Sequence, residues 1–352
     1  MQNSPEKLII VSGIQPSGNL HLGNYFGAVQ QFIQFVDGGH ECYYFLANYH
    51  ALTSLRDPQR LLELTRSTAA DYLALGLDPS RCSIYVQSDL PEVCELQWIL
   101  TTVTPMGLLE RCHAYKDKVQ QGIPADHGLF AYPVLQAADI LIVRANRVPV
   151  GQDQKQHVEF ARDIAGSLNS LYKADLLTSP EAFIQEETGT IPGLDGRKMS
   201  KSYGNYIPIF AEPQNLKKLI MKIQTDSKTP EEPKDPDHSA IVQLYRHFAT
   251  EADYALMRES FTLGGMGYSE AKNLLFEAVK NKLETSRKNY ADLISSPESL
   301  EDMLAQGAQK ARVKAQETLR RVSKAMLGRS IVQDAPEKKP ESRRTFIPPR
   351  GW

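Results

Sequence analysis

The feature that most constrains the fold is an alternation of short apolar runs with helix-like repeats over the first 90 residues. Apolar runs of strand length occupy residues 8–12, 42–47 and 83–87. Apolar residues recur at helical spacing from Tyr25 to Val36, and a second helix is expected from Asp57-Pro58 to about Gly76. Because parallel strands need crossover connections, this alternation predicts an α/β fold with a doubly wound parallel sheet.

The rest of the chain changes character near residue 205. Helical patterns dominate 92–171, with a short extended interruption at Pro149-Val150, and the Gly- and Lys-rich stretch 187–206 predicts a loop. Only helical patterns follow from Pro213 to Gly328. We therefore expect an α/β domain over 1–205 with a helical insertion at about 90–145, an all-α domain over 206–330, and a disordered tail over 331–352.

Composition narrows the functional classes. The 352 residues carry a formal net charge of −2, so any RNA contact must come from local patches. Four cysteines occur without a C-x-x-C pair, at 42, 82, 94 and 112, so neither a zinc ribbon nor a disulfide framework is expected and no metal ligands are assigned. Nothing resembles a signal peptide or an 18-residue apolar span, so the cytoplasm is the expected compartment.

The first candidate site lies where the first strand ends, at the sequence Gly-Ile-Gln-Pro-Ser-Gly-Asn-Leu-His-Leu-Gly-Asn of residues 13–24. Free backbone N–H groups at the start of the following helix would form an anion site, which Gly23 would leave open to a ligand. His21 could donate a hydrogen bond to a phosphate oxygen. An ordinary strand-to-helix turn with a surface histidine explains the same residues equally well.

The second candidate site is Lys198-Met199-Ser200-Lys201-Ser202, in the predicted loop. Two lysines on a mobile, glycine-flanked loop can clamp a polyphosphate and supply positive charge where pyrophosphate leaves. A solvated basic loop is the alternative interpretation.

Together the two motifs resemble the paired signatures of class I aminoacyl-tRNA synthetases. The last position of the first motif is Asn24 where the commoner form has histidine, and this is the form of the tryptophanyl branch. Residues 12–18, 132–141 and 148–157 also resemble that branch, and the likeness covers roughly residues 8–328. It implies a Rossmann-like fold, ATP-dependent activation of L-tryptophan to an adenylate, and transfer to tRNA(Trp) with release of AMP and diphosphate.

The resemblance also implies roles for individual residues. Those implied in catalysis are Gln15, His21, Lys198 and Lys201. Those implied in ATP binding are Gln15, Pro16, Ser17, Gly23, Asn24, Gly151, Gln152, Asp153, Ile191, Lys198, Met199, Ser200, Lys201 and Ser202, with Mg²⁺ accompanying the phosphates.

For the amino acid, the resemblance makes Asp139 the acceptor of the indole N–H, which is a donor only. Walls of the indole pocket are implied at Val11, His50, Val148 and Val150. Tyr132 and Gln154 match positions that hold the ammonium and carboxylate groups, and the set is completed by Gly13 and Gln136.

Partners follow from the same likeness: a homodimer formed through the 90–145 insertion, and an all-α domain that reads the tRNA anticodon, with no membrane or DNA partner. Lys116 and Lys118 resemble a basic cluster that approaches the phosphates, and the helix from Ala308 to Arg329 carries a basic strip that could contact tRNA. Both sets are equally compatible with solvated or packed helix faces.

Three alternatives stay open from the residues. A tyrosyl-tRNA synthetase shares the plan, although the 13–18 and 148–151 segments favour tryptophan. A small-molecule adenylyltransferase would not need the helical half. A non-catalytic RNA-binding paralogue would be expected to have lost the lysines or Asp139.

Overall fold

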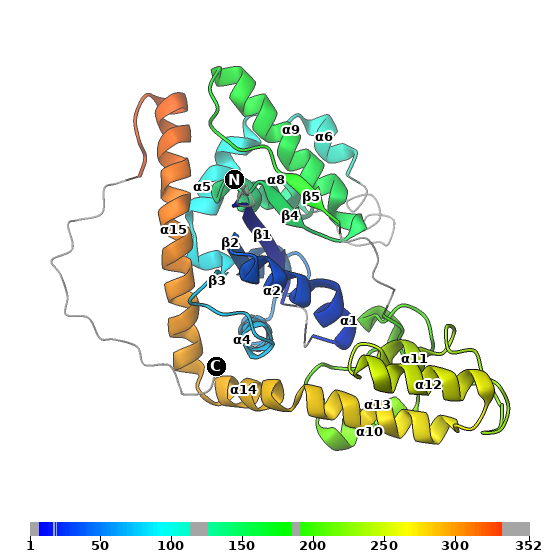
Figure 1. The fold of residues 1–352 in the computed structure, drawn as a ribbon. Coiled ribbons are helices and arrows are strands. Elements are labelled where there is room, and N and C mark those ends of the chain that lie inside the picture. The colour runs from blue at the N-terminus through cyan, green and yellow to red at the C-terminus, as the bar shows by residue number, and fades with distance from the viewer. Residues whose placement is uncertain (1–6, 17, 19, 113–125, 185–190, 333–352) are drawn as a thin grey trace, which may run out of the picture.

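We analysed a computed structural model that describes residues 7–16, 18, 20–112, 126–184 and 191–332 (Figure 1). These residues form one parallel sheet in the order β3-β2-β1-β4-β5. The strands are β1 (Ile9–Ile14), β2 (Glu41–Leu46), β3 (Ser83–Val86), β4 (Arg147–Pro149) and β5 (Glu181–Phe183). The predicted doubly wound parallel sheet is therefore confirmed, and its order reverses between β1 and β4.

Helices connect the strands and cover the sheet. The crossovers on the β1–β3 side contain α1 (Leu22–Asn24), a π-helical turn (Tyr25–Val29), α2 (Gln30–Asp37), α3 (Asn48–Ala51) and α4 (Pro58–Ala74). Between β3 and β4 lie a 3₁₀ turn (Gln87–Asp89), α5 (Glu92–Thr101), α6 (Met106–Glu110) and α8 (His127–Ile142). A second 3₁₀ turn (Gln152–Gln154) leads into α9 (Lys155–Tyr172), which connects β4 to β5.

The sequence predictions differ from the structure at two strands. β1 does not stop at Gly13 but runs on to Ile14, because a glycine fits under the Phe45 ring, whose Cζ would lie 2.3 Å from an added Cβ. β5 was not predicted at all, since three residues are too short to show a period.

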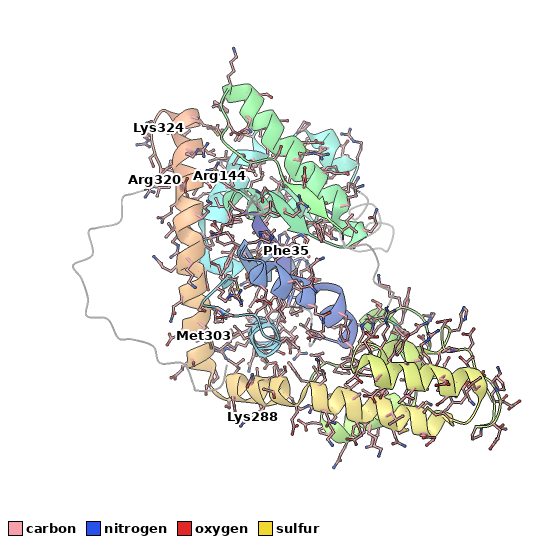
Figure 2. All side chains as sticks on the ribbon, in the orientation of Figure 1. Phe35, Arg144, Lys288, Met303, Arg320 and Lys324 are labelled. Atoms are coloured by element: carbon pink, nitrogen blue, oxygen red, sulfur yellow. The ribbon has the colours of Figure 1, made fainter. Side chains whose placement is uncertain are left out.

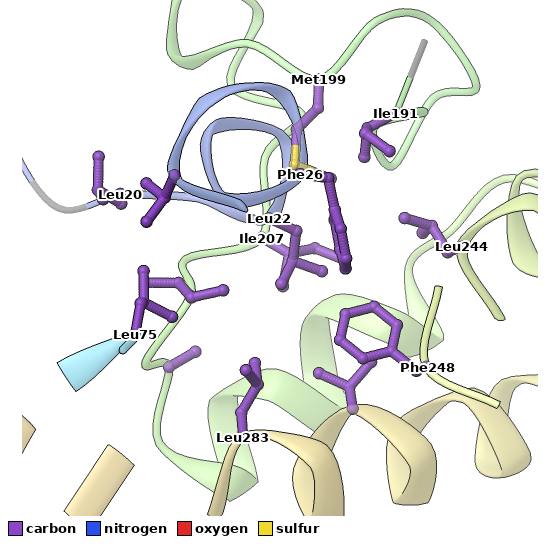
Figure 3. Close-up of a cluster of buried hydrophobic side chains, with 14 of the residues drawn as sticks. Leu20, Leu22, Phe26, Leu75, Ile191, Met199, Ile207, Leu244, Phe248 and Leu283 are labelled. Carbon is purple, nitrogen blue, oxygen red and sulfur yellow. The ribbon is translucent and has the colours of Figure 1, made fainter. Parts of the chain in front are cut away.

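A second, all-helical region follows the 3₁₀ turn at Lys201–Tyr203. Its elements are α10 (Pro213–Met221), α11 (Ala240–Tyr245), α12 (Glu251–Leu263), α13 (Tyr268–Lys282), α14 (Glu284–Ser295) and α15 (Pro297–Leu327). One apolar cluster joins it to the α/β region: Leu22, Met199 and Ile207 pack with Leu244 and Phe248 (Figure 3). The loops that carry the two sequence motifs are thereby tied to the helical region.

The last helix, α15, returns to the α/β region and runs along its β3 edge (Figure 1). Buried residues of this helix, among them Ala308, Ala311 and Leu319, belong to a second apolar cluster. This cluster lies on the face of the sheet opposite to the cluster that contains Leu22 and Phe248. Figure 2 shows Arg320 and Lys324 toward its C-terminal end, with Arg144 on the sheet side. Arg144 pairs with Glu317 of α15 at 3.6 Å.

The basic strip on α15 is partly a docking surface. Lys310 donates to the Pro79 carbonyl at 2.6 Å, Arg312 donates to the Asp89 carbonyl, and Arg321 donates to the Asp175 carbonyl. Arg312 also lies 3.3 Å from Glu92. For these three side chains the structure supports the packing interpretation over contact with tRNA.

Gly307 permits the close approach of α15 to the sheet. A Cβ there would lie 1.9 Å from the Ile84 carbonyl oxygen, which is backbone and cannot move aside alone. Gly166 on α9 is exposed and has nothing within 4 Å of a built Cβ. We expect Gly307→Ala to lower the free energy of unfolding by about 2 kcal/mol through overpacking, and Gly166→Ala to raise it by about 0.5–1 kcal/mol.

Urea denaturation of the two variants measures both effects. Because both substitutions are Gly→Ala within helices, helix propensity alone predicts the same sign for both. Stabilisation by Gly307→Ala would contradict the packing described here.

Candidate active site

Two adjoining cavities open at the carboxyl edge of the sheet, on either side of the point where the strand order reverses. The larger encloses about 990 Å³ and the smaller about 330 Å³. Both are lined by Ser12 and Gly13 of β1 and by Val150 and Gln154 after β4. Ligands of open parallel sheets bind at this kind of position, so the pair of cavities is the candidate site.

The larger cavity brings the two sequence motifs together. Its lining includes many of the residues predicted to bind ATP, namely His21, Gly23, Asn24, Gly151, Gln152, Ile191, Lys198, Met199 and Ser200. Other nominated residues do not line it: Gln15 faces the smaller cavity, and Pro16, Asp153, Lys201 and Ser202 line neither. Ser17, Lys116 and Lys118 lie outside the described residues.

The start of the helix after the first strand has fewer free N–H groups than the sequence predicts. α1 has three residues, and His21 and Asn24 cap each other: the Asn24 N–H donates to His21 Nδ1 at 3.2 Å, and the His21 N–H donates to Asn24 Oδ1 at 3.1 Å. Since Nδ1 accepts, the neutral ring carries its proton on Nε2. Burial, and then the nearby Lys201 ammonium, lower the pKa of His21 to about 4. His21 is therefore a neutral donor at pH 7.

The second motif is a hydrogen-bonded turn rather than an open loop. Asn205, which is buried, accepts from the Ser200 N–H at 2.8 Å and donates to the Lys198 carbonyl at 3.1 Å and to Asp195 at 2.6 Å. Met199 is buried and its N–H donates to the Ile191 carbonyl at 2.9 Å. Asn205 was not predicted from the sequence, because a lone asparagine in a loop carries no signal.

The Lys201 side chain reaches the first motif. Its ammonium donates to the Gly18 carbonyl at 3.0 Å. Burial lowers the pKa of Lys201, and the Asp71 carboxylate opposes that shift. The two motifs are therefore in direct contact.

The smaller cavity collects almost every residue nominated for the amino acid. Its lining includes Val11, Gly13, His50, Tyr132, Gln136, Val148, Val150 and Gln154. Phe45, Ala47 and Ile140 add apolar wall. The cavity also has polar lining at Tyr132, Gln136 and Gln154, and Gln154 lines the larger cavity as well.

Asp139 is the exception, because it lies behind His50 and does not line the cavity. It is 2% exposed; Asp139 Oδ2 lies 2.9 Å from His50 Nε2, and Gln87 Nε2 donates to both carboxylate oxygens at 2.8 Å. Burial raises the pKa of Asp139, while the hydrogen bonds from His50 and Gln87 oppose the rise. Gln87 is fully buried and was missed by the sequence analysis.

A buried group of polar side chains supports Tyr132. Its hydroxyl lies 3.2 Å from His157 Nε2, and Cys112 Sγ lies 3.4 Å from the same nitrogen. Burial, followed by the nearby Cys112 thiol, raises the pKa of Tyr132. The phenol therefore stays protonated, and Gln136 donates to Gln154 at 3.3 Å beside it.

Two properties of the described residues bear on cofactors and location. No group of three His, Cys, Asp or Glu side chains gathers where it could hold a metal ion, and the four cysteines are free thiols. None of the helices in this part of the chain is long and apolar enough to cross a membrane.

The fold and the two motifs agree with a known family. A sequence model described as "tRNA synthetases class I (W and Y)" matches residues 3–284, and the chain belongs to this family. ATP as a substrate is consistent with that membership.

Individual relatives point to the tryptophan branch. The tryptophan–tRNA ligase of Rhodopirellula baltica is 47% identical over 303 residues, covering 86% of this chain and 94% of the relative. The ligase of Bordetella pertussis is 46% identical over 339 residues, covering 94% of this chain and 75% of the relative.

A solved structure agrees with these relatives. The Campylobacter jejuni tryptophanyl-tRNA synthetase, complexed with ADP and tryptophan, has a TM-score of 0.87 and 44% identity over 91% of this chain and 99% of that one. The tyrosyl enzyme of Archaeoglobus fulgidus, at 24% identity and a TM-score of 0.62, shares the fold. The tyrosyl alternative is therefore not favoured.

Proposed function

We propose that this chain activates L-tryptophan with ATP to tryptophanyl-adenylate and transfers the tryptophanyl group to tRNA(Trp), with release of AMP and diphosphate. The observation that carries this function is the junction of the two cavities at Gly13 and Gln154. An apolar cavity for an indole opens there into a larger cavity lined by both motifs. The carboxylate of one substrate can thereby meet the α-phosphate of the other.

In the first step the tryptophan carboxylate oxygen attacks the α-phosphorus, an oxygen–phosphorus bond forms, and the bond to the leaving pyrophosphate breaks. No enzyme nucleophile is needed, so the protein contributes position and charge. Lys198 lines the larger cavity, and the Lys201 ammonium donates to the Gly18 carbonyl of the first motif. We assign both ammonium groups to the phosphates, and neutral His21 to donation from Nε2.

The remaining ATP contacts follow the position of the larger cavity. Ile191 and Met199 provide apolar wall for the base, and Gly151 and Gln152 lie after β4, where the ribose would reach. Mg²⁺, when bound with ATP, screens the phosphate charge. The described residues contain no group of three His, Cys, Asp or Glu side chains that would hold this ion.

The amino-acid contacts follow the smaller cavity. Among its polar lining residues, Tyr132 and Gln154 suit an ammonium and a carboxylate, while Val11, Val148 and Val150 enclose the ring. We propose that Asp139 controls recognition of the indole N–H, either by accepting it directly after a small rearrangement or by orienting His50, to which it is hydrogen bonded.

Charging of tRNA tests the complete reaction. With ATP and bacterial tRNA, the protein is expected to attach labelled tryptophan to tRNA(Trp) only. The product is measured as label that precipitates with the tRNA in acid. Formation of the adenylate without any transfer to tRNA would contradict the second half of the proposal.

We further propose a homodimer formed through the helical insertion, and anticodon recognition by the region from α10 to α14. Support for the dimer comes from two large apolar side chains on the insertion, Trp98 of α5 and Met106 of α6, which are 70% and 62% exposed. Trp and Met are among the residue types enriched at protein–protein interfaces.

Trp98→Arg is expected to shift the protein from dimer to monomer in sedimentation. Leu263→Arg is the matched control, because Leu263 is also 70% exposed but lies on α12, outside the insertion. A dimer that tolerates Trp98→Arg, or dissociates equally with Leu263→Arg, would place the interface elsewhere.

A further inference from the structure

A buried carboxylate lies beneath the first motif and has no part in the site described so far. Asp71, on α4, is 1% exposed, and its Oδ2 accepts the Leu20 N–H at 3.1 Å across 51 residues of sequence. Taking a carboxylate out of water costs free energy unless it is hydrogen bonded or paired with a charge. A carboxylate that is buried at this cost indicates that Asp71 has a role at this position.

Leu20 is fixed from two sides. Its N–H is held by Asp71, and its carbonyl accepts the Ile209 N–H at 2.9 Å. The next connection is Leu22 N–H to the Ile207 carbonyl at 3.0 Å. Residues 207–209 come shortly after the second motif. Leu20 therefore connects α4 and the first motif to the segment that follows the second motif.

The Asp71 charge also acts on Lys201. The two opposite charges attract each other. The Asp71 carboxylate raises the pKa of Lys201, and the Lys201 ammonium lowers the pKa of Asp71. Burial nevertheless raises the pKa of Asp71 to about 7, and the Leu20 N–H and Lys201 oppose that rise. Lys201 in turn donates to the Gly18 carbonyl, on the loop that ends at Leu20.

We propose that Asp71 is a positioning residue for adenylate formation, which holds the turn of the first motif at Leu20 and draws the Lys201 ammonium toward that turn. The inference rests on the proposed function, since it assigns Lys201 to the ATP phosphates. Asp71 does not touch a substrate; it acts through the loop backbone and through the lysine.

At pH 8 and above, where a carboxyl group with a pKa of about 7 is mostly ionised, Asp71→Asn separates the two contributions, because the amide oxygen can still accept the Leu20 N–H while the negative charge is lost. We expect kcat for tryptophan-dependent ATP–pyrophosphate exchange to fall about 10-fold, as for loss of a contact to a charged group, with KM for tryptophan unchanged. Asp71→Leu, which removes both contacts, should lower kcat by about 100-fold. Thr68→Val is the control, since Thr68 is equally buried on α4 and bonds only within that helix, to the Leu64 carbonyl.

A double-mutant cycle shows whether Asp71 acts through the lysine. In a Lys201→Ala background the effect of Asp71→Asn is expected to shrink to about twofold or less, because the partner of the charge is gone. An unchanged kcat in Asp71→Asn, an undiminished effect in the Lys201→Ala background, or an Asp71→Asn protein that fails to fold would each overturn the proposal. A wild-type protein without exchange activity would instead contradict the proposed function.

Discussion

Lys201→Ala is expected to slow adenylate formation by about 100- to 1,000-fold, or about 3 kcal/mol, the loss typical of one donor aimed at developing charge. In the structure the Lys201 ammonium already lies at the first motif, 3.0 Å from the Gly18 carbonyl, so little reorganisation is needed to reach a phosphate there. Because the charge on the leaving pyrophosphate grows only in the transition state, kcat should fall while the Kd for tryptophan stays the same.

Single-turnover measurement of adenylate formation separates these quantities. Lys222→Ala is the matched control, because Lys222 is an exposed lysine just after α10 and away from both cavities. Lys198→Ala should give a loss similar to that of Lys201→Ala. A rise in KM for ATP with an unchanged kcat would show instead that the lysines bind ground-state ATP only.

Asp139→Asn is expected to lower kcat/KM for tryptophan by about 100-fold, the upper range for a hydrogen bond to a charged group. The carboxylate accepts from both His50 and Gln87, and an amide has only one accepting oxygen for these donors. The amide NH₂ group would either point at one of these two donors or leave one of them without an acceptor. The substitution therefore disturbs the wall of the indole cavity as well as any direct bond to the indole N–H.

The decisive readout is the ratio of kcat/KM for tryptophan to that for phenylalanine, which has no N–H donor. That ratio should fall in Asp139→Asn. Asp126→Asn is the control on the same helix, where Asp126 caps the N-terminus and is exposed. An unchanged ratio would mean that Asp139 stabilises the fold and does not select the substrate.

Much of this architecture was accessible from sequence. Three apolar runs predicted β1, β2 and β3 because each has strand length and is bounded by turns. The helix beginning at Pro58 was predicted from its Asp-Pro start, and the structure shows Asp57 capping it. The two motifs were predicted to share a site because together they resemble the paired signatures of class I aminoacyl-tRNA synthetases, and residues of both line one cavity.

What sequence could not provide were contacts between distant polar residues. Gln87 and Asp139 are 52 residues apart, and Asp71 and Leu20 are 51 apart. An isolated Gln or Asp in a helical or turn pattern is indistinguishable from a surface residue until the fold buries it. The basic strip of α15 was ambiguous for the same reason, since only the docked helix shows which charges meet carbonyls.

The central claim, that this site activates tryptophan, is tested most directly by ATP–pyrophosphate exchange with each of the twenty amino acids. The apolar cavity lined by His50, which Asp139 holds by a hydrogen bond from behind, predicts rapid exchange with tryptophan and weak exchange with tyrosine and phenylalanine. Exchange driven equally well by tyrosine, or by no amino acid, would contradict the account.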